Sequence, residues 1–335
     1  MPHVRSLAFE KPVPYRPSRE NGGPGGEQPR EAEPSGSSLL ESPWPQRLGE
    51  GEGLRMGKTV RTRFAGMIAA THPIPAASVT TLVALLVAAR GGGAATLAWA
   101  VASTAAGQAS IGWSNDYLDR FEDARVGRRD KPLVAQSASA TVVARAAAAT
   151  FAASVALSVP LGLPETAVMA AAVGSAWVYN LILKRTALSW LPYAVSFGLV
   201  PVYVWVSTGA FPPWWLVGTA ALLGVAAHLT NVLPDLDEDA VLGRRGLPNR
   251  LGPRASLFGA CSLLLAALGL VLVAGGSSPS ATPGMAVAGI AAVGLVGGVF
   301  LSVRRGRPKA GFYLTIAAAA AIAAVLILSL RATAL

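Results

Sequence analysis

Apolar segments of about 20 residues follow one another along the chain from residue 66 to residue 331, separated by short polar or Gly/Pro-rich breaks. A helix needs about 20 apolar residues to cross roughly 30 Å of hydrocarbon. The alternating pattern of a membrane β-strand is absent from these segments, and Ala and Leu dominate them. The pattern therefore predicts an all-α membrane protein with nine transmembrane helices, at residues 66–89, 94–114, 138–160, 164–183, 188–209, 213–233, 255–275, 283–303 and 311–331.

The N-terminal stretch has a different composition. Residues 1–55 are rich in Pro, Gly, Ser and Glu and contain no apolar run long enough for the core of a signal peptide. We expect a disordered tail over residues 1–55 and one nine-helix membrane domain over residues 60–335.

Composition supports the membrane assignment and excludes several classes of soluble protein. The chain of 335 residues is 52% hydrophobic and 14% charged, whereas soluble proteins average about 25% charged residues. Its single cysteine, Cys261, lies in an apolar run, which excludes a disulfide framework and a cysteine-rich zinc site.

The net charge of +10 has a topological explanation. With the N-terminus inside, fifteen Lys and Arg residues fall in loops on the inner face and only Arg90 and Arg331 fall on the outer face. The inner residues are Arg120, Arg125, Arg128, Arg129, Lys131, Lys184, Arg185, Arg244, Arg245, Arg250, Arg254, Arg304, Arg305, Arg307 and Lys309. By the positive-inside rule the N-terminus is cytoplasmic, and the charge does not require a nucleic-acid partner. We expect a multi-pass protein of the cytoplasmic membrane.

Acidic residues are concentrated at the inner ends of two predicted spans. Ten acids follow residue 66, and nine of them lie within residues 116–130 and 235–239. Steps of three and four residues place the polar side chains of the first group on one helix face. This face carries Asn115, Asp116, Asp119 and Asp123. In the second group Asn231, Asp235 and Asp239 are four residues apart, and Pro234 is expected to kink the backbone there.

Two explanations fit a cluster of acids at a membrane surface. The first is a solvated face whose carboxylates pair with the arginines between them. The second is a metal site, because two carboxylates about 4 Å apart repel by about 4 kcal/mol at an effective dielectric constant near 20. Carboxylate and amide oxygens select a hard cation, and Mg²⁺ is favoured when a phosphate completes the coordination shell. Two clusters of equal spacing on the same membrane face favour the metal site.

Three motifs resemble those of the UbiA-type intramembrane prenyltransferases. The segment NDYLDRFED, residues 115–123, is similar to the first aspartate-rich motif of that family, and Asp235 with Asp239 resembles the second. The segment YNLILK, from Tyr179 to Lys184, is similar to the Tyr/Lys segment that ends the fourth helix. The resemblance covers residues 60–331.

The resemblance implies a helical bundle around a central cavity. There, a polyprenyl diphosphate is held through Mg²⁺ by both aspartate motifs, and its prenyl group passes to a small hydrophobic acceptor. Carried over by position, the Mg²⁺ ligands are Asn115, Asp116, Asp119, Asp123, Asn231, Asp235 and Asp239. Of these, Asp116, Asp119, Asp235 and Asp239 are the candidate catalytic residues, and Lys184 is implied to contact the diphosphate. Asp237 is an additional acid, which we expect on a different face of its helix.

Elementary chemistry sets the same requirements. Departure of diphosphate leaves charge on oxygen and an allylic cation on carbon, so cationic donors are needed on one side and a dry aromatic pocket on the other. We therefore add Arg128 and Lys131 to Lys184 as candidate diphosphate ligands. Candidate pocket residues are Tyr117, Tyr179 and His228, and His228 lies one turn before Asn231.

The leading hypothesis is a Mg²⁺-dependent prenyltransferase for an aromatic or quinone-precursor acceptor, with its site on the cytoplasmic side of the membrane. A membrane terpene cyclase and transfer to a non-aromatic acceptor are compatible with the same scaffold. An ion-coupled transporter is the alternative from another class, since acids in membrane helices also form ion pathways.

Overall fold

The computed structural model describes residues 61–274 and 282–333, and all regular elements in these two ranges are helical. The predicted tail over residues 1–55 lies outside the described residues. A short helix, Arg61–Ala69, precedes the main elements. These are α2 (Pro73–Ala89), α3 (Ala94–Arg125), α4 (Ala140–Ser158), α5 (Leu163–Leu181), α6 (Leu191–Val206), α7 (Trp214–Val232), α8 (Leu236–Val241), α9 (Leu247–Ala274), α10 (Thr282–Arg304) and α11 (Pro308–Thr333).

All these helices except the short α8 coincide with predicted spans, but only some meet the length and hydropathy of a transmembrane helix on their own. In the described part of the chain five do so, namely Ala140–Leu161, Trp214–Val241, Leu247–Ala274, Pro283–Arg304 and Pro308–Ser329. The bent pair Arg61–Ala69 and α2, which meet at 60°, makes a sixth. The chain is thus a multi-pass membrane protein, and the count of nine spans stays a prediction.

Two helices extend further at the polar end of the bundle than the apolar pattern predicts. Helix α3 continues to Arg125, although its apolar run ends near residue 114, and α9 begins at Leu247 rather than at residue 255. In α9 the first turn is set off by a break at Gly252, whose φ of 75° favours glycine, followed by Pro253. In both helices the apolar pattern ends where the membrane is predicted to end, whereas the backbone hydrogen bonds of the helix continue beyond it.

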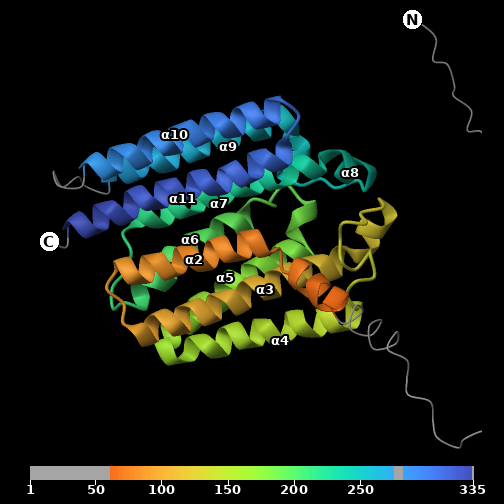
Figure 1. The fold of residues 1–335 in the computed structure, drawn as a ribbon, viewed down its shortest axis with the longest axis horizontal. Coiled ribbons are helices and arrows are strands. Elements are labelled where there is room, and N and C mark those ends of the chain that lie inside the picture. Colours follow the sequence, from red (N-terminus) through yellow and green to blue (C-terminus); the bar gives the residue numbers. More distant parts are fainter. Residues whose placement is uncertain (1–60, 275–281, 334–335) are drawn as a thin grey trace, which may run out of the picture. The chain divides into compact units, whose positions relative to one another are not determined.

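The helices form a closed bundle (Figure 1). Helices α2 to α6 lie together on one side, and α7, α9, α10 and α11 lie on the other. Contacts between α6 and α7 join the two groups at one seam, and contacts between α2 and α11 join them at the other. The core between them is made of aliphatic side chains such as Val83, Val204, Leu264 and Ile322, each at most 2% exposed.

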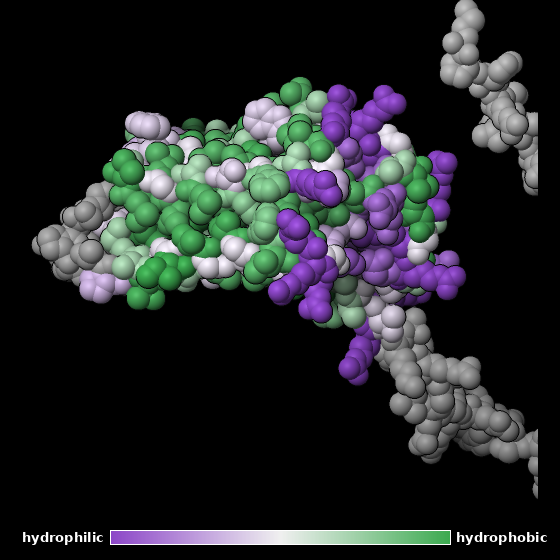
Figure 2. Space-filling model, turned by 90° about the horizontal axis from the view of Figure 1, so that it is seen from above, coloured by the Kyte–Doolittle hydropathy of each residue, from purple (hydrophilic) through white to green (hydrophobic). Residues whose placement is uncertain are grey.

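Polar side chains gather at one end of this bundle. Figure 2 shows a largely hydrophobic surface along the helices and a hydrophilic band at the end where α8 lies in Figure 1. Large apolar side chains are exposed away from that band: Phe211, in the loop before α7, is 84% exposed, and Leu163, at the start of α5, is 79% exposed. A surface of this kind is expected of a protein in a bilayer with one basic face.

The charge asymmetry predicts which loops share a membrane face. We expect single cysteines at Arg129 and Arg245 to react with an impermeant maleimide from the cytoplasmic side, and cysteines at Leu163 and Phe211 from the opposite side. Labelling intact cells and inverted vesicles measures this. Reaction of Arg129 and Arg245 positions from opposite faces would refute a common site for the two acid clusters.

Candidate active site

Helix α3 places three carboxylates on the inside of the bundle. The side chains of Asp116, Asp119 and Asp123 follow one another at helical spacing, and these residues are 2%, 5% and 4% exposed. A buried carboxylate is costly unless it is paired or hydrogen-bonded. Each of the three therefore requires a cationic partner from another element.

The second acid cluster lies just after the end of α7. Helix α7 ends at Val232, a 3₁₀ turn covers Leu233–Asp235, and α8 follows. Pro234 in that turn accounts for the break, as predicted. Asp239 is 5% exposed, Asp235 is partly buried and Asp237 is exposed. The exposure of Asp237 and the burial of Asp239 agree with the expectation that Asp237 lies on a different face of its helix.

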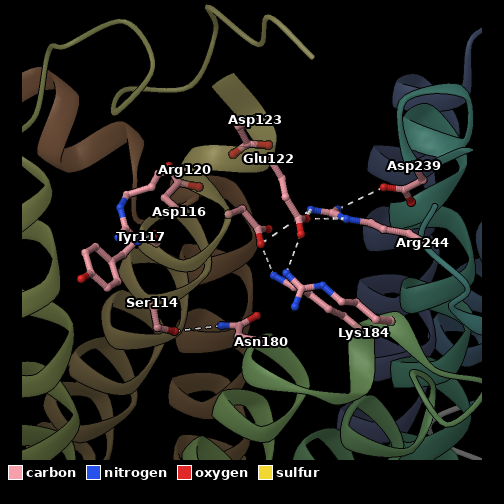
Figure 3. A network of polar contacts seen from close by, with 12 residues as sticks. Ser114, Asp116, Tyr117, Arg120, Glu122, Asp123, Asn180, Lys184, Asp239 and Arg244 are labelled. Carbon is pink, nitrogen blue, oxygen red and sulfur yellow. Dashed lines mark hydrogen bonds and ion pairs between the residues drawn. The ribbon is translucent and has the colours of Figure 1, made fainter. Parts of the chain in front are cut away.

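Arg244 connects the two clusters. Its guanidinium lies 3.0 Å from Asp239 Oδ1, 2.5 Å from Glu122 Oε2 and 3.6 Å from Asp119 Oδ1. Figure 3 shows it extending between Glu122 of α3 and Asp239 of α8. Neither Arg244 nor Glu122 was a predicted site residue. Glu122 lies three positions after Asp119, and this spacing was the signal for a shared face.

Arg128 makes a second connection, from the loop after α3. It lies 3.3 Å from Asp235 Oδ2, 3.4 Å from Glu238 Oε2 and 4.0 Å from Asp123 Oδ1. The residues that sequence analysis assigned to two metal-binding motifs therefore meet at one end of the bundle. Two arginines occupy the space between these motifs.

Three further basic side chains contact the acids of α3. Lys184, which follows α5, contacts Asp119. Lys131 Nζ lies 2.8 Å from Asp116 Oδ1, and His72 Nε2 lies 2.9 Å from the same oxygen. Both lysines were predicted diphosphate ligands, and the structure places both ammonium groups at the first aspartate motif.

The position of His72 depends on a close approach of backbones. His72 lies in the break between Arg61–Ala69 and α2, with a φ of 53°. The break packs on Gly112 of α3, where a Cβ atom would lie 2.5 Å from the carbonyl oxygen of Thr71. A side chain at residue 112 would push the break away from α3, and His72 with it.

Burial and charge oppose each other at these groups. Burial, together with the nearby carboxylates of Asp119 and Asp116, raises the pKa of Asp123 to about 6 against the attraction of Lys131 and Arg128. Burial also lowers the pKa of Lys184, although Asp119 counteracts this effect. Added anionic charge would be unfavourable at the acids themselves, so a diphosphate requires additional positive charge here.

A group of aromatic side chains from α5, α6 and α7 lies beside the acids. His228 is 1% exposed, and its ring centroid lies 4.7 Å from that of Tyr193 and 5.7 Å from that of Tyr179. The Ser189 hydroxyl lies 2.9 Å from His228 Nε2 and accepts a hydrogen bond from the backbone N–H of Leu247 at 2.8 Å. His228 Nδ1 is buried and has no partner among the described residues.

The remaining predicted residues are placed less centrally. Asn231 donates to the Tyr193 hydroxyl at 3.5 Å, and the side chain of Asn115 makes no hydrogen bond to a described residue. The Tyr117 ring lies against the Arg120 guanidinium, 4.0 Å away, on the side of α3 away from Lys184 (Figure 3). The structure therefore groups Tyr179 with His228 but does not bring Tyr117 to that pocket.

Asn180 is a buried residue that sequence analysis missed. It is 3% exposed and donates to the Ser114 hydroxyl at 2.8 Å and to the Ile111 carbonyl at 3.1 Å. These bonds fix the end of α5 against α3, directly before the acids (Figure 3). Its position next to Tyr179 in the sequence gave no separate signal for this role.

The donor set fits Mg²⁺. No three His, Cys, Asp or Glu side chains in the described ranges converge closely enough to form a complete metal cage. Mg²⁺ is usually held by one or two carboxylates together with substrate phosphates, so a preformed cage is not required. Asp116 Oδ2 is buried and has no hydrogen-bond partner in the described part of the chain, which leaves a hard oxygen donor available.

Comparisons with known proteins agree on one family. The model of the UbiA prenyltransferase family matches residues 77–318. No curated protein sequence matches the chain. The apo structure of a UbiA homolog from Aeropyrum pernix K1 has 20% identity and a TM-score of 0.62, over 75% of this chain and 96% of that one.

Two further solved structures have the same fold. A UbiA homolog from Archaeoglobus fulgidus, bound to DMAPP and Mg²⁺, has 16% identity and a TM-score of 0.58, over 78% of this chain and 98% of that one. A digeranylgeranylglyceryl phosphate synthase has 14% identity and a TM-score of 0.54, over 83% of this chain and all of that one. At these identities the likeness establishes the fold.

Proposed function

Since this chain belongs to the UbiA prenyltransferase family, we propose that it transfers the prenyl group of a polyprenyl diphosphate to an aromatic or quinone-precursor acceptor in the membrane. One observation carries the proposal. Arg128 and Arg244 join the aspartate motif of α3 to that of α7 and α8, so both motifs face one volume. A site for a single metal-bound diphosphate requires this convergence.

The carboxylates would hold Mg²⁺. The proposed carboxylate ligands are Asp116, Asp119 and Asp123 from α3 and Asp235 and Asp239 from the α7–α8 segment. The amide oxygens of Asn115 and Asn231 are proposed to complete this set. Bound Mg²⁺ would neutralise charge that develops on the leaving diphosphate. The relative with DMAPP and Mg²⁺ bound supports the pairing of this ion with a prenyl diphosphate.

The cations of the site would bind and orient the diphosphate. Lys184 and Lys131 are fixed by Asp119 and Asp116, so their ammonium groups are held at the position where phosphate oxygens are proposed to lie. Arg128 offers a planar guanidinium from the loop after α3, suited to two phosphate oxygens at once. These groups stabilise the leaving group and retain it after the bond to carbon breaks.

The acceptor is proposed to bind on the aromatic side. The ring faces of Tyr179 and Tyr193 would stabilise an allylic cation, and both rings would exclude water. His228 packs against both rings and has an unpaired ring nitrogen, which is suited to hold or deprotonate an acceptor oxygen. The transporter hypothesis gives no role to this aromatic group.

Product analysis tests the proposal. We expect membranes containing the protein to convert geranyl, farnesyl or geranylgeranyl diphosphate and a phenolic acceptor into a prenylated product, detected by mass spectrometry and dependent on Mg²⁺. Membranes containing Asp116→Asn are the matched control. A cyclised hydrocarbon without acceptor would indicate the cyclase alternative. Transfer only to a glycerol phosphate would indicate the acceptor class named for one structural relative. Absence of all three products would refute the proposal.

A further inference from the structure

The chain after Asp239 carries positive charge that no acid of its own compensates. Residues 240–335 contain nine Lys and Arg residues and no Asp or Glu. Of the nine, Arg244 pairs with acids of α3 and α8. Seven of the others are exposed and form no ion pair with an acid in the described ranges, namely Arg245, Arg250, Arg254, Arg304, Arg305, Arg307 and Lys309. Their charge is therefore available to an anion from outside the chain.

These bases lie at the end of the bundle that carries the hydrophilic band. Helix α9 begins at this end, and α10 ends there before the turn into α11 (Figure 1). Helices α9 and α10 contact each other and run antiparallel. The band borders the hydrophobic surface of the helices in Figure 2. The exposed bases thus lie at the depth where the headgroups of a surrounding bilayer are expected.

An aromatic pair connects α9 and α10 near this end. The ring centroids of Phe258 on α9 and Phe300 on α10 lie 5.6 Å apart, with an angle of 60° between the ring planes. Phe258 is 59% exposed, so the pair forms part of the outer surface of the bundle. Aromatic rings at the boundary of the hydrocarbon contact the interfacial region of the lipids.

Helix geometry places one arginine of each helix beside this pair. Arg254 precedes Phe258 by four residues, and Arg304 follows Phe300 by four. Residues four apart share a helix face. Because the helices are antiparallel, both arginines lie one turn nearer the polar end than the rings. The Arg304 guanidinium lies 5.7 Å from the centroid of the Phe300 ring, a cation–π contact that restrains it there.

We propose that this surface binds an anionic phospholipid, with Arg254 and Arg304 on the oxygens of its phosphate and the Phe258–Phe300 pair against its glycerol and the first methylenes of its acyl chains. A guanidinium matches two phosphate oxygens at once, and basic pockets between membrane helices bind anionic headgroups. The inference goes beyond the proposed prenyl transfer and does not depend on it, since none of these four side chains pairs with the two acid clusters.

Charge and exposure favour a lipid over two other occupants. A second copy of the chain on this face would bring arginines against arginines, and α9, α10 and α11 contain no acid to compensate them. A free phosphate would bind the arginines but leave the exposed Phe258 ring without a partner. An anionic lipid provides both the phosphate and the apolar contact.

Two lipids with identical acyl chains test the site. Dioleoyl phosphatidylglycerol carries a net negative headgroup, whereas dioleoyl phosphatidylcholine is neutral. Each base near an anionic lipid contributes about fivefold in affinity. We therefore expect the delipidated full-length protein to bind its first phosphatidylglycerol at least about tenfold more tightly than phosphatidylcholine, measured by native mass spectrometry. The double variant Arg254→Gln, Arg304→Gln should lose this preference, and each single variant should lose part of it.

The matched control is Arg305→Gln, Arg307→Gln. It removes the same charge from the neighbouring turn, but neither residue is four positions from a ring of the pair. It should keep the preference to within about twofold. An equal affinity of the wild type for both lipids would overturn the inference. So would an equal loss in the two double variants, because binding would then follow total charge and not the pair of arginines.

Competition distinguishes the lipid from the other two occupants. Glycerol 1-phosphate carries the phosphate without acyl chains, and a hundredfold excess should leave phosphatidylglycerol bound. Its displacement would show a site for free phosphate and overturn the lipid proposal. A dimer that dissociates in Arg254→Gln, Arg304→Gln would show that the surface binds a second copy. Phosphatidylglycerol should also raise the Tm of the wild type and not that of this variant, because a ligand stabilises only the form that binds it.

Discussion

Asp119→Asn is expected to lower the turnover of prenyl diphosphate by at least about 10³-fold, equivalent to about 4 kcal/mol. The carboxylate of Asp119 is buried and contacts both Lys184 and Arg244. Replacement by the neutral amide removes one proposed Mg²⁺ ligand and the negative charge that compensates the positive charges of Lys184 and Arg244. Single-turnover kinetics with purified protein over a range of Mg²⁺ concentrations measures the loss.

Asp237→Asn is the matched control for this variant. It removes the same charge from the same end of the bundle, but Asp237 is exposed. We expect activity within about twofold of the wild type, because isolated surface charges contribute little. Wild-type turnover of Asp119→Asn at ordinary Mg²⁺, or an equal loss in both variants, would contradict the assignment of the site to the buried acids.

The element types and the position of the site follow from patterns that act locally. Apolar length predicted the helices, and the three-and-four spacing after Asn115 predicted the face that buries Asp116, Asp119 and Asp123. Pro234 predicted the break before α8. In each case the determinant lies within one or two turns of the residue concerned, so the sequence alone carries the information.

The partners of these acids could not be predicted in the same way. Arg244 is 122 residues from Glu122 in the chain, and it was interpreted only as a determinant of topology. Its contact depends on how α8 and the start of α9 fold back over the end of α3. The observed helix ends also differ from the predicted ones. Polar residues after residue 114 continue α3 through backbone hydrogen bonds, which a hydropathy pattern does not predict.

Contacts between helices also decide the pocket. Gly224 of α7 approaches α6 so closely that a Cβ atom would lie 2.5 Å from the Tyr193 carbonyl oxygen. This approach brings Tyr193 against His228. Sequence analysis identified His228 as an ionisable residue inside a span, but its neighbours depend on the packing of three helices.

Arg244→Gln is expected to lower kcat/KM for the diphosphate by about 10²-fold, equivalent to about 2.7 kcal/mol. Arg244 is the group that contacts Asp119, Glu122 and Asp239 together. Without it, carboxylates from α3 and α8 face one another with less positive charge between them, and the two motifs separate. Steady-state kinetics at varied diphosphate measures the change, which we expect mainly in KM.

Two companion variants identify the cause of that loss. Arg244→Lys keeps the charge but not the planar fork, so we expect it to recover about tenfold of the lost kcat/KM. Arg245→Gln removes the neighbouring charge from an exposed residue whose side chain makes no contact with a described acid, and it should stay near wild type. If Arg244→Gln and Arg245→Gln had equal kinetics, the basic pair would serve topology alone. A loss of activity in Arg244→Gln that increased Mg²⁺ partly reverses would show that the guanidinium and the metal share the task of holding both aspartate motifs at one diphosphate.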